Sequence, residues 1–183
     1  MCNFSPRALL AIVIVMAFTA CSPALDWREM PAADGTVRVA FPARPKSETR
    51  PLSIAGEPVP FTLTAATVKG AVFAVGYLDL PASLVDDEEK RQQYKQALED
   101  SLARNLQAED IQRRTVSVRH AHGQKEVAAD ELELHGEPAD TPTWMLARVL
   151  LVENRLIEVA AVGPEKALTP DAARTFVDSL RVQ

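Results

Sequence analysis

The stretch Thr143-Trp-Met-Leu-Ala-Arg-Val-Leu-Leu-Val-Glu-Asn-Arg-Leu-Ile-Glu-Val-Ala-Ala-Val162 decides the fold of this chain. Residues 143–152 and 155–162 are each apolar on both sides of an extended strand, because alternate side chains point to opposite faces of a sheet. Glu153-Asn154 fits a two-residue hairpin loop, in which Asn tolerates a positive φ. A strand that is apolar on both faces must be covered on both faces. The stretch therefore predicts two central antiparallel strands of a covered sheet.

Further strands are predicted on both sides of this stretch. The segment 71–80 is also apolar on both faces, whereas the other segments alternate or are polar. Prolines confine a strand to the edge of a sheet, so the proline-rich segment 46–60 is expected at an edge, interrupted by a turn at Gly56. A bulge near Val127 is expected, since the apolar positions around it fall out of phase. The predicted strands are 36–41, 46–60, 61–69, 71–80, 113–120 and 124–135.

Two helices complete the predicted fold. The first covers residues 84–108, with Ser83 as N-cap and Asp86 reaching back to it as in a capping box. The second starts at Thr169-Pro170-Asp171, where an N-cap residue precedes a proline and an acidic first turn. The sequence thus predicts an α+β fold: an α/β/α sandwich with a mainly antiparallel sheet of about six to seven strands, one long middle helix and a C-terminal helix.

The N-terminus has the pattern of an export signal. Arg7 is followed by eleven apolar residues, Ala8 to Phe18, and then by small residues. Phe18-Thr19-Ala20-Cys21 resembles the lipobox of bacterial lipoproteins, in which the signal is cut before the cysteine and acyl chains such as palmitate are attached to it. The resemblance implies lipidation of Cys21, and Ser22 resembles the class sorted to the outer membrane. Several acyl chains together hold a protein firmly on a membrane.

Two alternatives to the lipoprotein remain open. The uncharged stretch 8–25 has 18 residues, near the lower limit of about 17–25 for a spanning helix, so it could be an uncleaved anchor. The other alternative is a soluble protein from which the signal peptide has been cleaved. The predicted division of the chain is a lipoprotein signal peptide at 1–20, a lipidated Cys21 with a tether at 21–35, and one domain at 36–183.

The order of several motifs resembles a known family. Val37-Arg-Val-Ala-Phe-Pro-Ala-Arg-Pro45, Val75-Gly-Tyr-Leu-Asp-Leu-Pro81, Leu151-Val-Glu-Asn-Arg-Leu-Ile157 and Ala172-Ala-Arg-Thr-Phe-Val-Asp-Ser-Leu180 are similar to an exported bacterial domain of the PsbP type. That α/β/α sandwich is shared by a photosystem II extrinsic subunit and a Ran-binding nuclear import factor. The resemblance covers residues 36–182 and implies a binding or accessory role. It assigns no functional residue.

Composition argues against several function classes. The formal net charge is −5, whereas nucleic-acid binding needs clustered Lys and Arg to neutralise phosphates, so no nucleic-acid partner is expected. The sequence lacks a Gly-x-Ser-x-Gly elbow, a Ser-x-x-Lys pair, a His-Glu-x-x-His motif, a P-loop and a Gly-x-Gly-x-x-Gly motif. We therefore expect a protein that is not an enzyme and that has no cofactor and no metal.

The histidines and arginines are weak candidates for a site. His120 and His122 would face the same side of a strand and could hold a weak surface metal together with His135. The favoured interpretation is that His120 and His122 are simply two polar residues beside a turn, since zinc needs three or four converging ligands. Arg113-Arg114 could form a small basic spot with Arg119, although a solvated strand face is favoured.

Three further residues allow both a functional and a structural interpretation. Asp130 and Glu131 are interpreted as charges on the faces of a strand rather than as a catalytic pair. Trp144 is expected in the core rather than as an exposed binding anchor.

The sequence favours a membrane-anchored lipoprotein of the cell envelope, on the periplasmic side and with the outer membrane slightly favoured. It would act as a non-catalytic binding or assembly factor for an envelope protein. The alternatives are a carrier of a small ligand or lipid, with a cleft between sheet and helix lined by Phe61, Phe73 or Trp144, a domain of unknown function on an uncleaved anchor, or an enzyme of unrecognised type.

Overall fold

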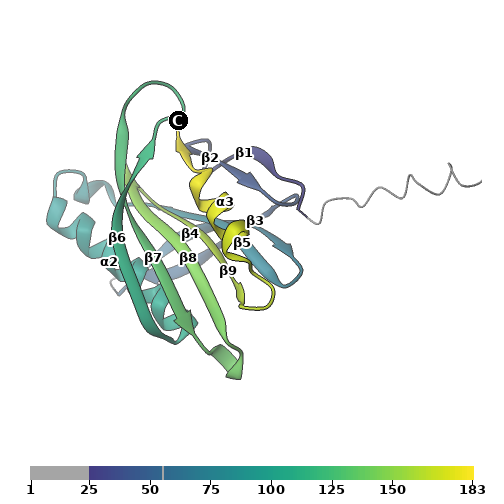
Figure 1. The fold of residues 1–183 in the computed structure, drawn as a ribbon. Helices are drawn as coiled ribbons and strands as arrows, with labels where there is room; N and C mark the ends of the chain where they lie inside the picture. Colours follow the sequence, from purple (N-terminus) through teal and green to yellow (C-terminus); the bar gives the residue numbers. More distant parts are fainter. Residues whose placement is uncertain (1–24, 55) are drawn as a thin grey trace, which may run out of the picture.

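The computed structural model describes residues 25–54 and 56–183 (Figure 1). The predicted signal at 1–20, Cys21 and the first part of the predicted tether lie outside the described residues. The described chain is mostly strand, in one seven-stranded and one three-stranded sheet, with the α-helices α2 (Glu88–Leu106) and α3 (Pro170–Asp178). This confirms the prediction of an α+β fold with a mainly antiparallel sheet.

The large sheet has the strand order β3-β4-β5-β9-β8-β7-β6, and each neighbouring pair is antiparallel. Val152 pairs with Arg155, which confirms the predicted hairpin at 153–154. The residue with positive φ is Glu153, at 52°, and not Asn154 as expected. Asn154 instead donates its side-chain amide to the carbonyl of Leu80 at 2.6 Å. The strands are β3 (Lys46–Ile54), β4 (Glu57–Val68), β5 (Ala71–Asp79), β6 (Ala108–Arg119), β7 (Glu126–Gly136), β8 (Thr143–Val152) and β9 (Arg155–Pro164).

The three-stranded sheet was only partly predicted. It consists of β1 (Arg28–Ala32), β2 (Val37–Phe41) and β10 (Arg181–Val182), with β2 in the middle. The segment predicted as the first strand of the main sheet therefore belongs to a separate sheet. The predicted tether is also too long, because β1 pairs with β2 along its whole length and the Asp26 amide donates to the carbonyl of Pro42 at 2.9 Å. Backbone pairing, not apolar alternation, fixes β1.

The middle helix begins later than predicted. Asp87, not Ser83, is its N-cap and accepts the Lys90 amide on Oδ1 at 3.1 Å. Ser83 lies in a separate 3-10 turn, Ala82–Leu84, which buries Leu84 in the core. A second 3-10 turn covers Pro138–Asp140. The C-terminal helix begins as predicted, since Thr169 Oγ1 accepts the Ala172 amide at 3.2 Å.

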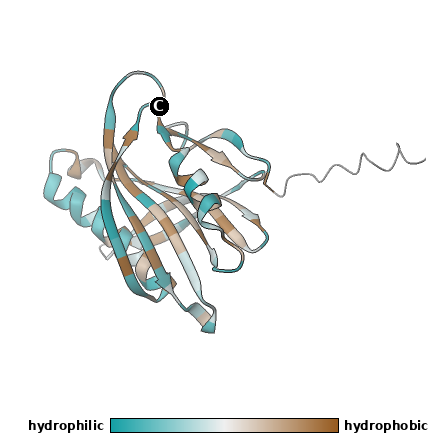
Figure 2. Cartoon of the chain, viewed as in Figure 1, coloured by the Kyte–Doolittle hydropathy of each residue, from teal (hydrophilic) through white to brown (hydrophobic). Residues whose placement is uncertain are grey.

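Each face of the large sheet carries its own core. The α3-face core combines strand residues such as Phe73 and Leu150 with α3 and the three-stranded sheet. The α2-face core combines residues such as Leu156 and Leu134 with α2 and the β3–β4 hairpin. Figure 2 shows hydrophobic residues along the central strands and a largely hydrophilic α2. The buried stripe of α2 is Tyr94, Leu98, Glu99, Leu102 and Leu106, and that of α3 is Ala172, Ala173, Phe176 and Val177.

The bulge predicted near Val127 is wrong. Strands β6 and β7 pair without a break from Asp110–His135 to Arg119–Glu126, and the only irregularity between them lies at 108–110. Val127 packs against the α3-face core, whereas Leu132 packs in the α2-face core. The apolar positions change phase because β7 is covered on one face at its start and on the other face further along.

Candidate functional site

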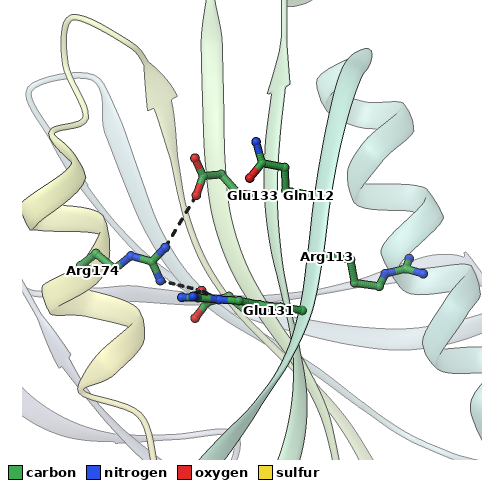
Figure 3. A pocket seen from close by; sticks show the side chains of 6 residues that line it. Gln112, Arg113, Glu131, Glu133 and Arg174 are labelled. Atoms are coloured by element: carbon green, nitrogen blue, oxygen red, sulfur yellow. Dashed lines mark hydrogen bonds and ion pairs between the residues drawn. The ribbon is translucent and has the colours of Figure 1, made fainter.

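A buried carboxylate lies where α3 crosses the strands β6, β7 and β8. Glu131 on β7 is 2% exposed. Its Oε1 accepts Arg114 Nε at 2.9 Å and Arg174 Nη1 at 2.5 Å, and its Oε2 accepts Arg148 Nε at 2.8 Å. Figure 3 shows Arg174 reaching from α3 toward Glu131 and Glu133. These four residues, Glu131 with its three arginines, form a charged cage.

The sheet register explains how the cage forms. Arg114, Glu131 and Arg148 pair directly across three neighbouring strands, so their side chains leave the same face in one row. Arg148 also donates to the Val177 carbonyl at 2.8 Å and forms an ion pair with Asp178. The cage therefore ties three strands to α3, and its members are bonded to one another in fixed geometry.

The protonation of Glu131 limits the chemistry that it can perform. Burial raises its pKa, but hydrogen bonds from Arg174, Arg114 and Arg148 outweigh burial and lower the pKa to about 2. The carboxylate is therefore ionised at neutral pH and saturated by donors. A general acid or base needs a pKa near the working pH, so Glu131 is an internal counter-ion rather than a proton carrier.

An open groove runs beside the cage, between α3 and the strands β6–β8. One hollow, of about 160 Å³, is lined by three members of the cage, Glu131, Arg114 and Arg174, and by neighbouring polar residues of β6 and β7. A second hollow, of about 310 Å³, shares Glu133 and Arg174 with the first and extends to Trp144. We call the two hollows together the α3 groove. It is lined by Gln112, Arg113, Arg114, Glu131, Glu133, His135, Trp144, Glu165, Leu168, Pro170 and Arg174.

Trp144 is held rigidly at the apolar end of the α3 groove. Its side chain is mostly buried, as predicted, and its Nε1–H donates to the Leu168 carbonyl at 3.0 Å. The His135 ring stacks on the indole with centroids 6.1 Å apart and an angle of 15° between the rings. Trp144 thus belongs to the core and also lines the groove.

The histidines and arginines proposed from sequence do not gather into sites. His120 follows the end of β6, whereas His135 pairs with Asp110 at the other end of the β6–β7 hairpin. Within residues 25–54 and 56–183, no three His, Cys, Asp or Glu side chains are arranged to hold a metal ion. The basic spot considered as the alternative to a solvated strand face does not form, since Arg113 contacts Glu99 on one face of β6 and Arg114 contacts Glu131 on the other.

Asp130 and Glu131 also point to opposite faces of the sheet. Asp130 Oδ2 accepts Lys95 Nζ at 2.6 Å on the α2 face, while Glu131 faces α3. Glu131 differs from the expectation of an ordinary strand-face charge, because it is buried. The aromatic residues proposed for a carrier cleft are divided as well. Phe73 lies in the α3-face core and Phe61 packs against the α2-face core.

Two buried carboxylates on the α2 face were not singled out from sequence. Glu99 on α2 is 3% exposed, and its Oε2 pairs with Arg113 Nη2 at 2.7 Å. Glu158 on β9 is 6% exposed and has no hydrogen-bonding partner for Oε2 among the described residues. Burial is the main cause that raises each pKa to about 7. The signal for Glu158 was a lone charge inside a strand that is otherwise apolar on both faces.

Among the described residues, no helix combines the length and the apolar character needed to cross a bilayer. The sequence matches no protein-family model and no curated protein.

Proposed function

We propose that this protein is a lipid-anchored lipoprotein of the cell envelope that acts as a non-catalytic binding or assembly factor, and that the α3 groove holds its protein partner. The observation that carries the proposal is that Trp144 and Arg174 line one open groove and that each is held there by its own hydrogen bond, to Leu168 and to Glu131. Tryptophan and arginine are the residues that most often supply binding energy at protein interfaces.

The groove suits binding because its anchors are already ordered. Trp144 is fixed by its bond to Leu168, and Arg174 is fixed by Glu131 and Glu133. A partner therefore immobilises few side chains when it docks, which lowers the entropic cost of association. The residues that line the groove include no Ser, Thr or Cys nucleophile, and its buried carboxylate is ionised at neutral pH. These features favour recognition over catalysis.

For the fold we propose the PsbP-type α/β/α sandwich. Its support is the division of the apolar residues into two cores, one with α2 and one with α3, on opposite faces of the large sheet. The three-stranded sheet beside α3 is an addition to the simplest form of that sandwich.

We propose Cys21 as the lipid attachment site, on the periplasmic side, with the outer membrane favoured. The folded chain begins close behind it, because the Asp26 amide is already bonded to Pro42. Five residue steps separate Cys21 from Asp26, which span at most about 18 Å of fully extended chain. The domain would thus stay next to the bilayer surface, where tethering raises the effective concentration of a membrane-bound partner.

The anchor is tested by substituting Cys21→Ser in the full chain. We expect loss of acyl labelling and release of the protein from the membrane fraction. The matched control is Cys2→Ser, which leaves the second cysteine intact and should leave labelling unchanged. Membrane association and labelling that survive Cys21→Ser would overturn the lipid anchor and favour an uncleaved N-terminal helix.

The role of the groove is tested by photo-crosslinking in intact cells. A photoreactive amino acid is introduced at Gln112 or Glu165, which line the groove, and at the control position Gln92 on the exposed side of α2. We expect a discrete protein adduct from the groove positions and not from the control. Equal adducts from Gln92 would contradict the groove. A lipid or metabolite bound at Trp144, without a protein adduct, would favour the carrier alternative.

A further inference from the structure

Another hollow, which is not part of the α3 groove, lies between the β1–β2 turn and the exposed end of strands β3–β5. Its volume is about 370 Å³. Four hydroxyl side chains line one side of it: Ser47, Thr62, Thr64 and Tyr77. We call this site the hydroxyl hollow. Figure 1 shows the β1–β2 hairpin beside the strands that carry these residues.

The register of β4 explains why hydroxyls gather here. Alternate residues Thr62, Thr64 and Ala66 leave the same face of the strand, opposite Tyr77, Val75 and Phe73 of β5. Ala66 is buried in the α3-face core, whereas Thr62 and Thr64 remain partly exposed. The elements that cover the α3-face core therefore reach Ala66 but leave Thr62 and Thr64 partly exposed, and these exposed positions of β4 are threonines.

The walls of the hydroxyl hollow are held in place by hydrogen bonds. Ser47 Oγ lies 2.8 Å from Thr64 Oγ1, and the Tyr77 hydroxyl donates to Asp34 Oδ2 at 2.6 Å. The Arg155 guanidinium lies 4.6 Å from the centre of the Tyr77 ring and also donates to the Ala33 carbonyl at 2.7 Å. Arg155 therefore locks the turn that carries Asp34 against β5. A ligand would meet a site that is already formed.

The chemistry of the lining indicates the ligand class. Hydroxyl groups donate and accept, and Asp34 adds a carboxylate acceptor. The lining includes no Lys or Arg, and Arg155 beside the Tyr77 ring is already paired with Asp34 and Asp79, so little positive charge is free to bind a phosphate or a carboxylate. Met30, Pro31 and Pro45 supply apolar contact on the other side. A neutral molecule with many hydroxyls and apolar C–H faces matches this lining, and carbohydrates are that class.

We propose that the hydroxyl hollow binds a neutral oligosaccharide, with Thr62, Thr64 and Asp34 bonding its hydroxyls. The site shares no residue with the α3 groove, so the two proposals stand or fall separately. Binding by one such shallow hollow would be weak, with a dissociation constant on the order of 1 mM.

The test titrates the full-length protein with three neutral probes: a β1,4-linked N-acetylglucosamine tetramer, cellotetraose and maltotetraose. Binding is followed by calorimetry and by chemical-shift changes of backbone amides. We expect saturable binding of at least one probe, with shifts centred on Ser47, Thr64 and Tyr77. The double substitution Thr62→Val with Thr64→Val keeps the side-chain shape and removes both hydroxyls, so affinity should fall at least about tenfold.

The matched control is Thr67→Val, on the same strand but facing the other side of the sheet, because Thr67 pairs with Val72. Affinity should be unchanged in this variant. The proposal is overturned if no probe saturates by about 10 mM, if the double variant binds as well as the parent, or if the shifts map elsewhere. Shift mapping on the parent protein decides the question even where the double variant fails to fold.

Discussion

Glu158 on β9 lies directly across from Gly76 on β5, and the missing side chain of the glycine makes room for the glutamate. A Cβ added at Gly76 would come within 2.8 Å of both Cγ and Oε1 of Glu158, and it would also meet the Phe61 ring. The Glu158 carboxylate, whose Oε2 has no hydrogen-bonding partner in the part of the chain that the structure describes, thus packs against the backbone of Gly76.

The substitution Gly76→Ala should destabilise the protein, because the added methyl group has no space between Phe61 and Glu158. Overpacking of this kind costs about 1–3 kcal/mol in the free energy of unfolding. Urea denaturation of the parent and the variant measures the loss. Adding Phe61→Ala to Gly76→Ala should cost less than the sum of the two single losses, since the ring no longer blocks the methyl group. Strict additivity would contradict this account.

Glu158 should make stability fall as pH rises. Burial raises its folded-state pKa from 4.5 to about 7, so between these values the folded chain keeps a proton that the unfolded chain has released. The stabilising contribution is complete below about pH 4.5 and lost above about pH 7. Glu158→Gln, which cannot ionise, should raise the free energy of unfolding at pH 8, by at most about 3 kcal/mol.

The measurement is urea denaturation at pH 5 and pH 8 for the parent and Glu158→Gln. Glu99 has a pKa raised in the same direction, mainly by burial, so a smaller slope should remain in the variant. The double variant with Glu99→Gln should be nearly flat across this window. A pH dependence unchanged by Glu158→Gln would show that its carboxylate does not titrate there.

Glu131 should have the opposite effect. Its folded-state pKa is lowered to about 2, so its contribution to stability is present above about pH 4.5 and lost as pH falls toward 2. Glu131→Gln should cost about 3–5 kcal/mol at pH 7, because the buried Arg148 then keeps only the more exposed Asp178 as a counter-ion. The control on the same strand is Glu126→Gln, whose partner Arg119 is exposed and 3.7 Å away. It should change stability by less than about 1 kcal/mol, and similar losses in both variants would refute the cage.

The position of the α2 N-cap can be tested with two alanine substitutions. Asp87→Ala removes the acceptor for the Lys90 amide and should cost about 0.5–2 kcal/mol. Ser83→Ala removes a side chain that makes no capping bond and should change stability by less than about 0.5 kcal/mol. Thermal denaturation of the two variants compares them directly. A larger loss of stability in Ser83→Ala than in Asp87→Ala would instead indicate that Ser83 is the N-cap.

The elements that sequence predicts well are those set by local pattern. Tyr94, Leu98, Leu102 and Leu106 recur at helical spacing, and this stripe is the buried side of α2. The strands β8 and β9 are apolar on both faces and lie in the middle of the large sheet. By contrast, β1 and β10 have five and two residues. Their strand conformation depends on β2, which supplies backbone partners to both, so no local pattern reveals them.

The cage was beyond sequence reasoning for a similar physical reason. Glu131 is 17 residues from Arg148 and 43 residues from Arg174, and only the sheet register and the docking of α3 bring them together. A single charge in an apolar strand is nevertheless a usable signal, because burying a charge is costly unless a partner offsets it. Arg148 and Glu158 both carry that signal, and among residues 25–54 and 56–183 only Arg148 has an ionic partner.

The central position of β2 determines when the domain can finish folding. A ribosome makes β1 and β2 first, but Val37 pairs with Val182, and Phe41 packs against Phe176, with ring centroids 5.4 Å apart. Until those late residues emerge, the early hairpin exposes apolar side chains and has an unpaired edge, a state that chaperones hold. Completion of the small sheet is thus delayed until α3 and β10 have been made. Until then, the apolar side of the β1–β2 hairpin lacks the cover that α3 gives it in the folded domain.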